Sequence, residues 1–135
     1  MSFSLETEVN VKRGRESSEH RLMKRLIARV FTLLGWLVLF EKSYSDVIAF
    51  KCTNVTGLRL VCAEAENTLR NVIRNANRNF ANGCDAVLIL VPNDDLLAAV
   101  RRKVNKDLSR TQWSKVGITT LRQIEQAIQR LERRY

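Results

Sequence analysis

The stretch that decides how we interpret this chain is LRLVCAEAEN, residues 58–67. Its first residues alternate apolar and other side chains, as a strand with one buried face does, and successive strand side chains point to opposite faces. Five side chains therefore share one face of the predicted strand: Leu58, Leu60, Cys62, Glu64 and Glu66. The strand thus ends with two neighbouring carboxylates on the same face as Leu58 and Leu60 at its start.

These two acids need a positively charged or polar partner. Alternate side chains of a strand lie about 6 to 7 Å apart, so the two carboxylates repel each other. Burial of either one without a partner costs several kcal/mol. We expect either an arginine or a divalent cation close to Glu64 and Glu66.

The residues on both sides of this strand predict an α/β domain with a mixed central sheet. Helices are expected where apolar residues recur at a period of 3.6, and strands where short β-prone runs lie between turns. The expected order is αβββαβαβα, at residues 19–34, 36–41, 46–52, 58–66, 67–83, 84–92, 94–106, 114–120 and 121–134.

The connections between these elements determine the expected topology. Short polar connections make the first three strands an antiparallel meander. The strand at residues 84–92 is apolar at almost every position, which is typical of a parallel strand covered on both faces. In the first helix, we expect Leu22, Leu26, Val30 and Leu33 to face the core, with Ile27 and Leu34 widening this stripe, and Gly35 to end the helix.

Length and composition indicate one domain. The 135 residues are 45% hydrophobic and 27% charged, which is ordinary globular composition. The polar start predicts a flexible tail over residues 1–14, followed by a single domain over residues 15–135.

The net charge of +9 predicts a polyanionic partner, either nucleic acid or an anionic membrane surface. A protein that is merely basic remains an alternative. The most apolar stretch, residues 30–40, is too short to span a bilayer and lies too far along the chain for a signal peptide. The three cysteines lack CxxC spacing and are expected to be reduced core residues. We therefore predict a cytoplasmic protein with no membrane partner.

A candidate metal site follows from the predicted hairpin. Asp46 begins the second strand, whose start lies beside the end of the third, so Asp46 should neighbour Glu64. Carboxylate oxygens are the ligands that Mg²⁺ or Mn²⁺ prefers. The alternative is that Asp46 and Glu64 are ordinary charges at a hairpin end in water.

Together these features resemble the PD-(D/E)XK, or restriction-endonuclease-like, nuclease superfamily. The resemblance rests on Glu19, Asp46 and Glu64-x-Glu66 in the order αβββαβ, and covers roughly residues 13–91. The segments RGRESSEHRL, SDVIAF and LRLVCAEAE are most similar to small archaeal Holliday-junction resolvases. The family proline is absent, since Ser45 precedes Asp46.

The resemblance implies a catalytic set of Glu19, Asp46, Glu64 and Glu66. Asp46 and Glu64 would hold Mg²⁺ or Mn²⁺, and Glu19, or Glu16 in its place, would approach the metal. Glu66 falls where the family has a lysine, so a positive charge must come from elsewhere. Lys51 lies on the opposite strand face, and an arginine of the next helix is the better candidate.

The helix after Glu66 carries that positive charge. Arg70, Arg74 and Arg78 recur every four residues beside the candidate site, a spacing that suits phosphate contacts; a solvated helix face is the alternative. No base-reading signature accompanies them, so we expect recognition of the DNA backbone rather than of sequence.

We therefore predict a Mg²⁺-dependent nuclease acting on DNA, with branched DNA as a candidate substrate and a homodimer as a candidate assembly. The first alternative is an inactive nucleic-acid-binding or assembly module of the same fold. The second is an α/β partner-binding domain without a nucleic-acid role.

Overall fold

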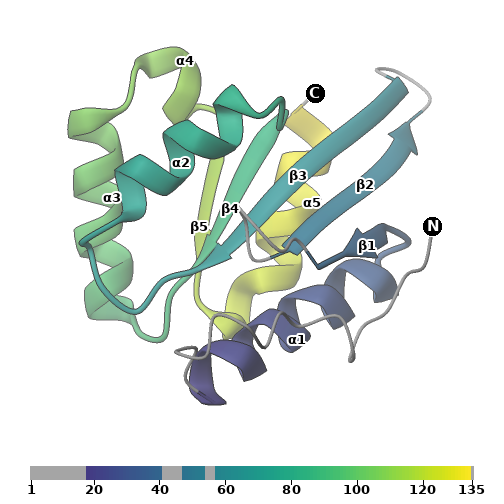
Figure 1. Cartoon of the computed structure of the whole chain (residues 1–135), viewed down its shortest axis with the longest axis horizontal. Coiled ribbons are helices and arrows are strands. Elements are labelled where there is room, and N and C mark those ends of the chain that lie inside the picture. The colour runs from purple at the N-terminus through teal and green to yellow at the C-terminus, as the bar shows by residue number, and fades with distance from the viewer. Residues whose placement is uncertain (1–17, 41–46, 54–56, 135) are drawn as a thin grey trace.

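Helices and strands follow one another in the predicted order, with two single-turn additions. The computed structural model describes residues 18–40, 47–53 and 57–134 (Figure 1). The elements in chain order are α1 (Ser18–Leu33), β1 (Leu37–Leu39), β2 (Val47–Thr53), β3 (Gly57–Ala65), α2 (Val72–Ala81), β4 (Ala86–Leu90), α3 (Asp94–Asp107), α4 (Arg110–Trp113), β5 (Val116–Thr119), η2 (Leu121–Gln123) and α5 (Ile124–Arg134). The additions are α4 and the 3-10 turn η2, which the hydrophobic pattern did not predict.

The central sheet has five strands in the order β1-β2-β3-β4-β5. β1, β2 and β3 pair antiparallel, which confirms the predicted meander. β3, β4 and β5 pair parallel, with α2 and α3 in the crossovers (Figure 1). All five residues of β4 are buried, as its unbroken apolar sequence predicts for a strand covered on both faces.

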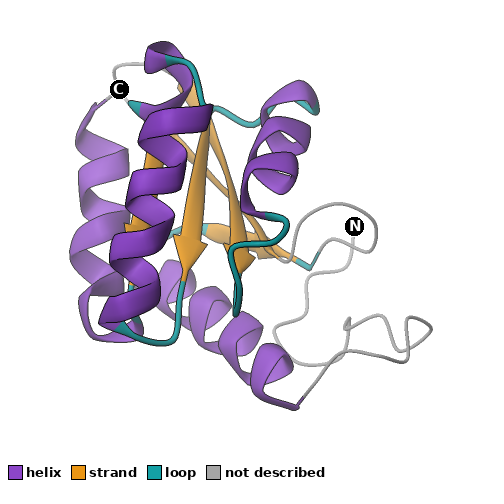
Figure 2. Ribbon diagram, turned by 90° about the vertical axis from the view of Figure 1, so that its left-hand side faces the viewer, coloured by secondary structure: helices purple, strands orange, loops and turns teal. Residues whose placement is uncertain are grey.

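Helices cover both faces of the sheet (Figure 2). One core cluster joins α1 and α5 to the face of β3 that carries Val61, Ala63 and Ala65. The other joins α2 and α3 to the opposite face through Val87 and Ile89 of β4. The mixed α/β sheet between two helical layers therefore confirms the coarse fold class.

The buried side of α1 agrees in part with the predicted one, since Val30 and Leu34 pack against the core as expected. Ile27 and Phe31 are fully buried, whereas Leu22 is 55% exposed and Leu33 is 79% exposed. The buried side of the helix is therefore centred on Ile27 and Phe31 rather than on Leu22 and Leu33. Phe31 packs edge-on against Trp36, with ring centroids 5.3 Å apart.

The most apolar stretch, residues 30–40, is divided between two elements. Its first residues complete α1 and later ones form β1, with Gly35 between them at a φ of +91°. Within the described residues, each helix is too short or too polar to cross a bilayer.

The second helix starts later than predicted. α2 begins at Val72, whereas the sequence pattern placed its start near Asn67. The preceding residues form a turn in which the backbone N–H of Arg70 donates to the hydroxyl of Thr68 at 3.3 Å. A threonine side chain that bonds the nearby backbone competes with helix formation, which delays the first helical turn.

The cysteines also differ from expectation. Cys62 in β3 and Cys84 just before β4 form a disulfide across a Cα–Cα distance of 6.0 Å, and Cys52 is exposed. The prediction of three reduced core thiols is therefore wrong, because parallel pairing brings the two strands within bonding distance. Cytoplasmic location stays a prediction.

Candidate active site

Glu64 of β3 and Glu66, the first residue after β3, are buried on the sheet face that α2 covers. Their neighbours Ala63 and Ala65 point to the other core cluster, so the predicted alternation of faces is confirmed. The exposed fraction is 5% for Glu64 and 9% for Glu66. These two acids are therefore not hairpin-end charges in water, and the interior must compensate their carboxylates.

Two asparagine amides of α2 supply hydrogen bonds to these carboxylates. Asn79 Nδ2 donates to Glu64 Oε2 at 2.8 Å, and Asn75 Nδ2 donates to Glu66 Oε2 at 2.9 Å. Four helical residues rise about 6 Å, and two strand residues rise about 6.6 Å. α2 runs antiparallel to β3. The spacing of Asn75 and Asn79 on the helix therefore matches the spacing of Glu66 and Glu64 on the strand.

The role of these asparagines was not predicted from the sequence. Asn79 is 1% exposed and lies on the same buried stripe as Val72 and Ala76. A polar residue at an apolar helical position is the signal that could have identified it, because a buried amide needs hydrogen-bonding partners.

A guanidinium extends this network. Arg78 Nη2 donates to Asn75 Oδ1 at 3.0 Å, so Asn75 links Arg78 to Glu66. The polarised amide transmits part of the positive field of Arg78 toward the carboxylate. Arg78 of the following helix is thus linked to Glu66 through one amide, and the role expected of such an arginine stays a prediction.

The three predicted DNA-binding arginines occupy different environments. Arg74 is exposed on α2 and Arg78 is half-buried on the same helix. Arg70 is exposed but precedes α2, so the prediction of one helical stripe through all three residues is wrong for Arg70. The reason is the late start of α2 described above.

Two members of the predicted catalytic set are placed differently or not described. Glu19 is exposed in the first turn of α1, a helix that packs on the opposite sheet face from Glu64 and Glu66. Asp46 lies outside the described residues, as do Glu16 and Ser45. Of the four predicted catalytic residues, the structure therefore brings Glu64 and Glu66 together. Among described residues, no group of three or more His, Cys, Asp or Glu could hold a metal ion.

Lys51 lies on the other side of the sheet, as predicted. Its Nζ pairs with Glu132 Oε1 of α5 at 2.8 Å and donates to the Leu34 carbonyl at 3.2 Å. The same ammonium lies 5.8 Å from the ring centroid of Trp36. Lys51 therefore joins α1, β2 and α5 on the face opposite the two glutamates.

Comparison of the chain with protein-family models, curated proteins and solved structures finds no match. Function is therefore inferred from the side chains themselves. Two buried carboxylates on one strand, held by amides at fixed oxygens, are suited to binding a hard cation or accepting a proton.

Proposed function

We propose that this protein is a Mg²⁺- or Mn²⁺-dependent nuclease that hydrolyses DNA phosphodiester bonds. The observation that carries the proposal is the pair of buried carboxylates of Glu64 and Glu66, each bonded to an asparagine amide of α2. Burial of acids is costly, and closely spaced buried acids are a feature of many catalytic sites. Branched DNA is the candidate substrate that the resemblance to junction resolvases favours.

The arrangement of elements supports the restriction-endonuclease-like fold as part of this proposal. The first six major elements follow the order αβββαβ, with an antiparallel meander and a following parallel strand. The resemblance rests on this order, and the acid pair closes the third strand, where the family motif has its second acid and its lysine.

The described acids supply oxygen ligands of the kind that a hard divalent cation prefers, but by themselves they do not complete a metal site. Glu64 supplies carboxylate oxygens, and oxygen ligands are those that Mg²⁺ and Mn²⁺ prefer. We propose that Asp46, the residue before β2, completes the site. In the ladder of β2 and β3, the first described pair is Val47 with Ala63, and these residues are the chain neighbours of Asp46 and Glu64. When bound, such a cation lowers the pKa of a water and neutralises charge on the scissile phosphate.

The chain's own residues then position the reacting groups. Asn79 fixes the Glu64 carboxylate through Oε2, so that the ligand does not rotate away from the phosphate. Glu66, oriented by Asn75, accepts the proton of the attacking water on its carboxylate. Arg78 supplies positive charge in place of the family lysine. Glu19 belongs to the proposed set through the resemblance alone, because α1 packs on the opposite sheet face.

DNA binding would rest on charge rather than on base contacts. The chain carries a net charge of +9, and exposed Arg74 lies on the helix that holds the acid pair. Contacts of this kind neutralise phosphates and release counterions, so binding should weaken steeply with salt. A homodimer would present two such sites to the two strands of a junction.

The test is cleavage of labelled duplex, single-stranded and four-way-junction DNA with Mg²⁺ or Mn²⁺. We expect cleavage by the wild type, its loss with EDTA, and a fall of at least about a hundredfold for Glu64→Gln. Glu125→Gln is the matched control, because Glu125 is exposed on α5. Equal cleavage by both variants would show that the activity does not depend on Glu64.

A second candidate function is a DNA-binding module without catalysis. The observation that favours it is Glu66, an anion where the family has a lysine. Salt-sensitive binding of the three DNA probes, with no cleavage by the wild type in either metal, would favour this module over the nuclease.

A further inference from the structure

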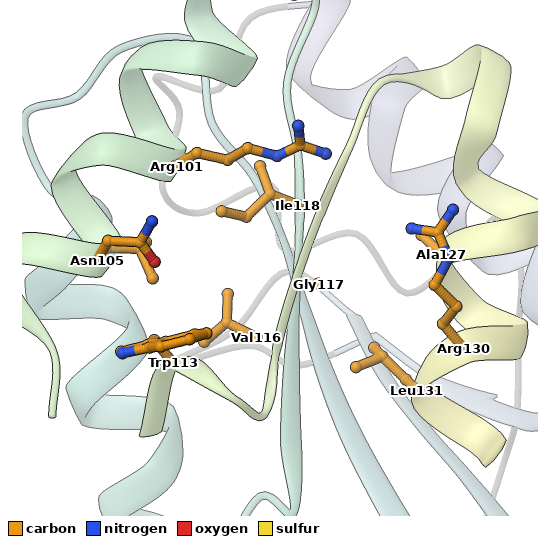
Figure 3. Close-up of a pocket in the computed structure, with 10 residues that line it drawn as sticks. Arg101, Asn105, Trp113, Val116, Gly117, Ile118, Ala127, Arg130 and Leu131 are labelled. Carbon is orange, nitrogen blue, oxygen red and sulfur yellow. The ribbon is translucent and has the colours of Figure 1, made fainter. Parts of the chain in front are cut away.

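The outer edge of the sheet beside β5 forms a groove. β5 is the last strand in the sheet order, and within the described chain β4 is its strand neighbour. A cavity of about 260 Å³ lies along this edge, with α3 and α4 on one side and α5 on the other. Figure 3 shows Gly117 of β5 in the middle of the cavity, between Trp113 and Arg130. The cavity lies outside the candidate active site, since neither glutamate lines it.

Among the described residues, the backbone groups of Val116 and Ile118 on the floor of the groove have no strand partner. The carbonyls of Lys115 and Thr119 accept hydrogen bonds from β4, from Val87 N at 3.0 Å and from Val91 N at 2.9 Å. Backbone groups of alternate strand residues point to the same side, so those of Val116 and Ile118 point away from β4 and into the groove. An edge of this kind is a template for another strand.

The walls of the groove are basic. Arg101 of α3 extends over the groove from one side and Arg130 of α5 from the other (Figure 3). Both arginines are exposed, and Trp113 at one end of the groove is 38% exposed. The groove therefore combines backbone donors and acceptors, positive charge on both walls and an accessible aromatic ring.

We propose that this groove binds an extended acidic segment of a partner protein, which adds a strand to the free edge of β5. The segment's backbone would pair with Val116 and Ile118, as in strand addition to an exposed sheet edge. Its carboxylates would meet Arg101 and Arg130, a contact that gives charge complementarity. This partner is distinct from the DNA of the proposed active site.

The same observations disfavour two other occupants. A second copy of the chain would bring the Arg101 and Arg130 pair against an identical basic pair, and opposed like charges are destabilising. A single-stranded nucleic acid could contact the arginines and stack on Trp113, but it would leave the backbone groups of Val116 and Ile118 without a strand partner.

The test uses fluorescence anisotropy with a labelled octapeptide of repeated Glu-Glu-Val-Val, which as an added strand presents carboxylates on both faces, toward Arg101 and toward Arg130. A Lys-Lys-Val-Val octapeptide and a thymidine dodecamer serve as comparison probes. We expect the acidic peptide to bind the wild type, and Arg101→Glu with Arg130→Glu to weaken its binding at least about tenfold. The matched control combines Arg102→Glu with Arg133→Glu, which makes the same change in charge on the same helices away from the cavity.

Hydrogen exchange of backbone amides separates strand addition from general attraction of charges. Bound peptide should slow exchange at Val116 and Ile118 about tenfold or more, and leave Gly117, whose N–H faces β4, unchanged. No binding of the acidic peptide, equal weakening by both double variants, or unprotected amides would overturn the proposal. Protection without peptide that grows with protein concentration would identify a second copy, and tighter binding of the dodecamer in the groove would identify nucleic acid; either result overturns it.

Discussion

Replacement of Asn79 by alanine tests whether the α2 amides hold the buried acids in place. Asn79 is 1% exposed, and its Nδ2 lies 2.8 Å from Glu64 Oε2. A hydrogen bond to a charged group contributes about 1.5 to 3 kcal/mol, and its loss leaves a buried carboxylate with one donor fewer. We expect the free energy of unfolding to fall by about 2 kcal/mol. For a domain of this size the melting temperature should fall by about 8 °C.

The assay is urea denaturation followed by circular dichroism, with EDTA present so that metal binding does not contribute. Asn77→Ala is the matched control, because Asn77 is exposed on the same helix and gains the same helix propensity. In a Glu64→Gln background the cost of Asn79→Ala should be about 1 kcal/mol smaller, since no buried charge loses its donor. Equal stability of Asn79→Ala and Asn77→Ala would refute the reasoning.

Three further predictions concern other parts of the chain. Lys51→Met should lower the free energy of unfolding in urea by about 1 kcal/mol, because the ion pair of Nζ with Glu132 of α5, 2.8 Å long, is lost. Lys103→Met removes an exposed ion pair within one helix and should cost less. An equal loss for both variants would show that the Lys51 pair contributes no more than an exposed one. Arg74→Gln should reduce by about one the slope of log affinity for DNA against log salt concentration, and Arg122→Gln is the control. If the slope is the same for Arg74→Gln, Arg122→Gln and the wild type, Arg74 does not contact DNA. Gly83→Ala should lower the free energy of unfolding by about 1 kcal/mol because φ is +99°, and Gly83→Asn should restore part of the loss; a neutral alanine variant would show that the turn adjusts its backbone.

Features that depend on local periodicity could be predicted from the sequence. The alternation in β3 places Glu64 and Glu66 on one face, and the unbroken apolar run of β4 indicates a strand covered on both sides. Asparagine is a favoured N-cap residue, and Asn93 caps α3 by accepting from the N–H of Leu96 at 2.9 Å. In each case neighbours in sequence determine the local structure.

Features that depend on contacts between distant elements could not be predicted in the same way. The bonds from Asn75 and Asn79 to the acids arise because α2 runs against β3, a geometry that no single segment contains. Apolar residues lie on both faces of α1, so the sequence alone does not determine which face is buried. The contact between Phe31 and Trp36 fixes the rotation of the helix. The groove beside β5 requires α3, α4 and α5 together.

Diffraction from crystals soaked in Mn²⁺, recorded where manganese scatters anomalously, tests the proposed metal site most directly. The proposal predicts an anomalous peak about 2.0 to 2.2 Å from a Glu64 carboxylate oxygen, with Asn79 still donating to that side chain. Glu64→Gln crystals soaked in parallel should lose the peak. A manganese peak elsewhere, with none at Glu64 in the wild type, would contradict the assignment of this carboxylate as a metal ligand.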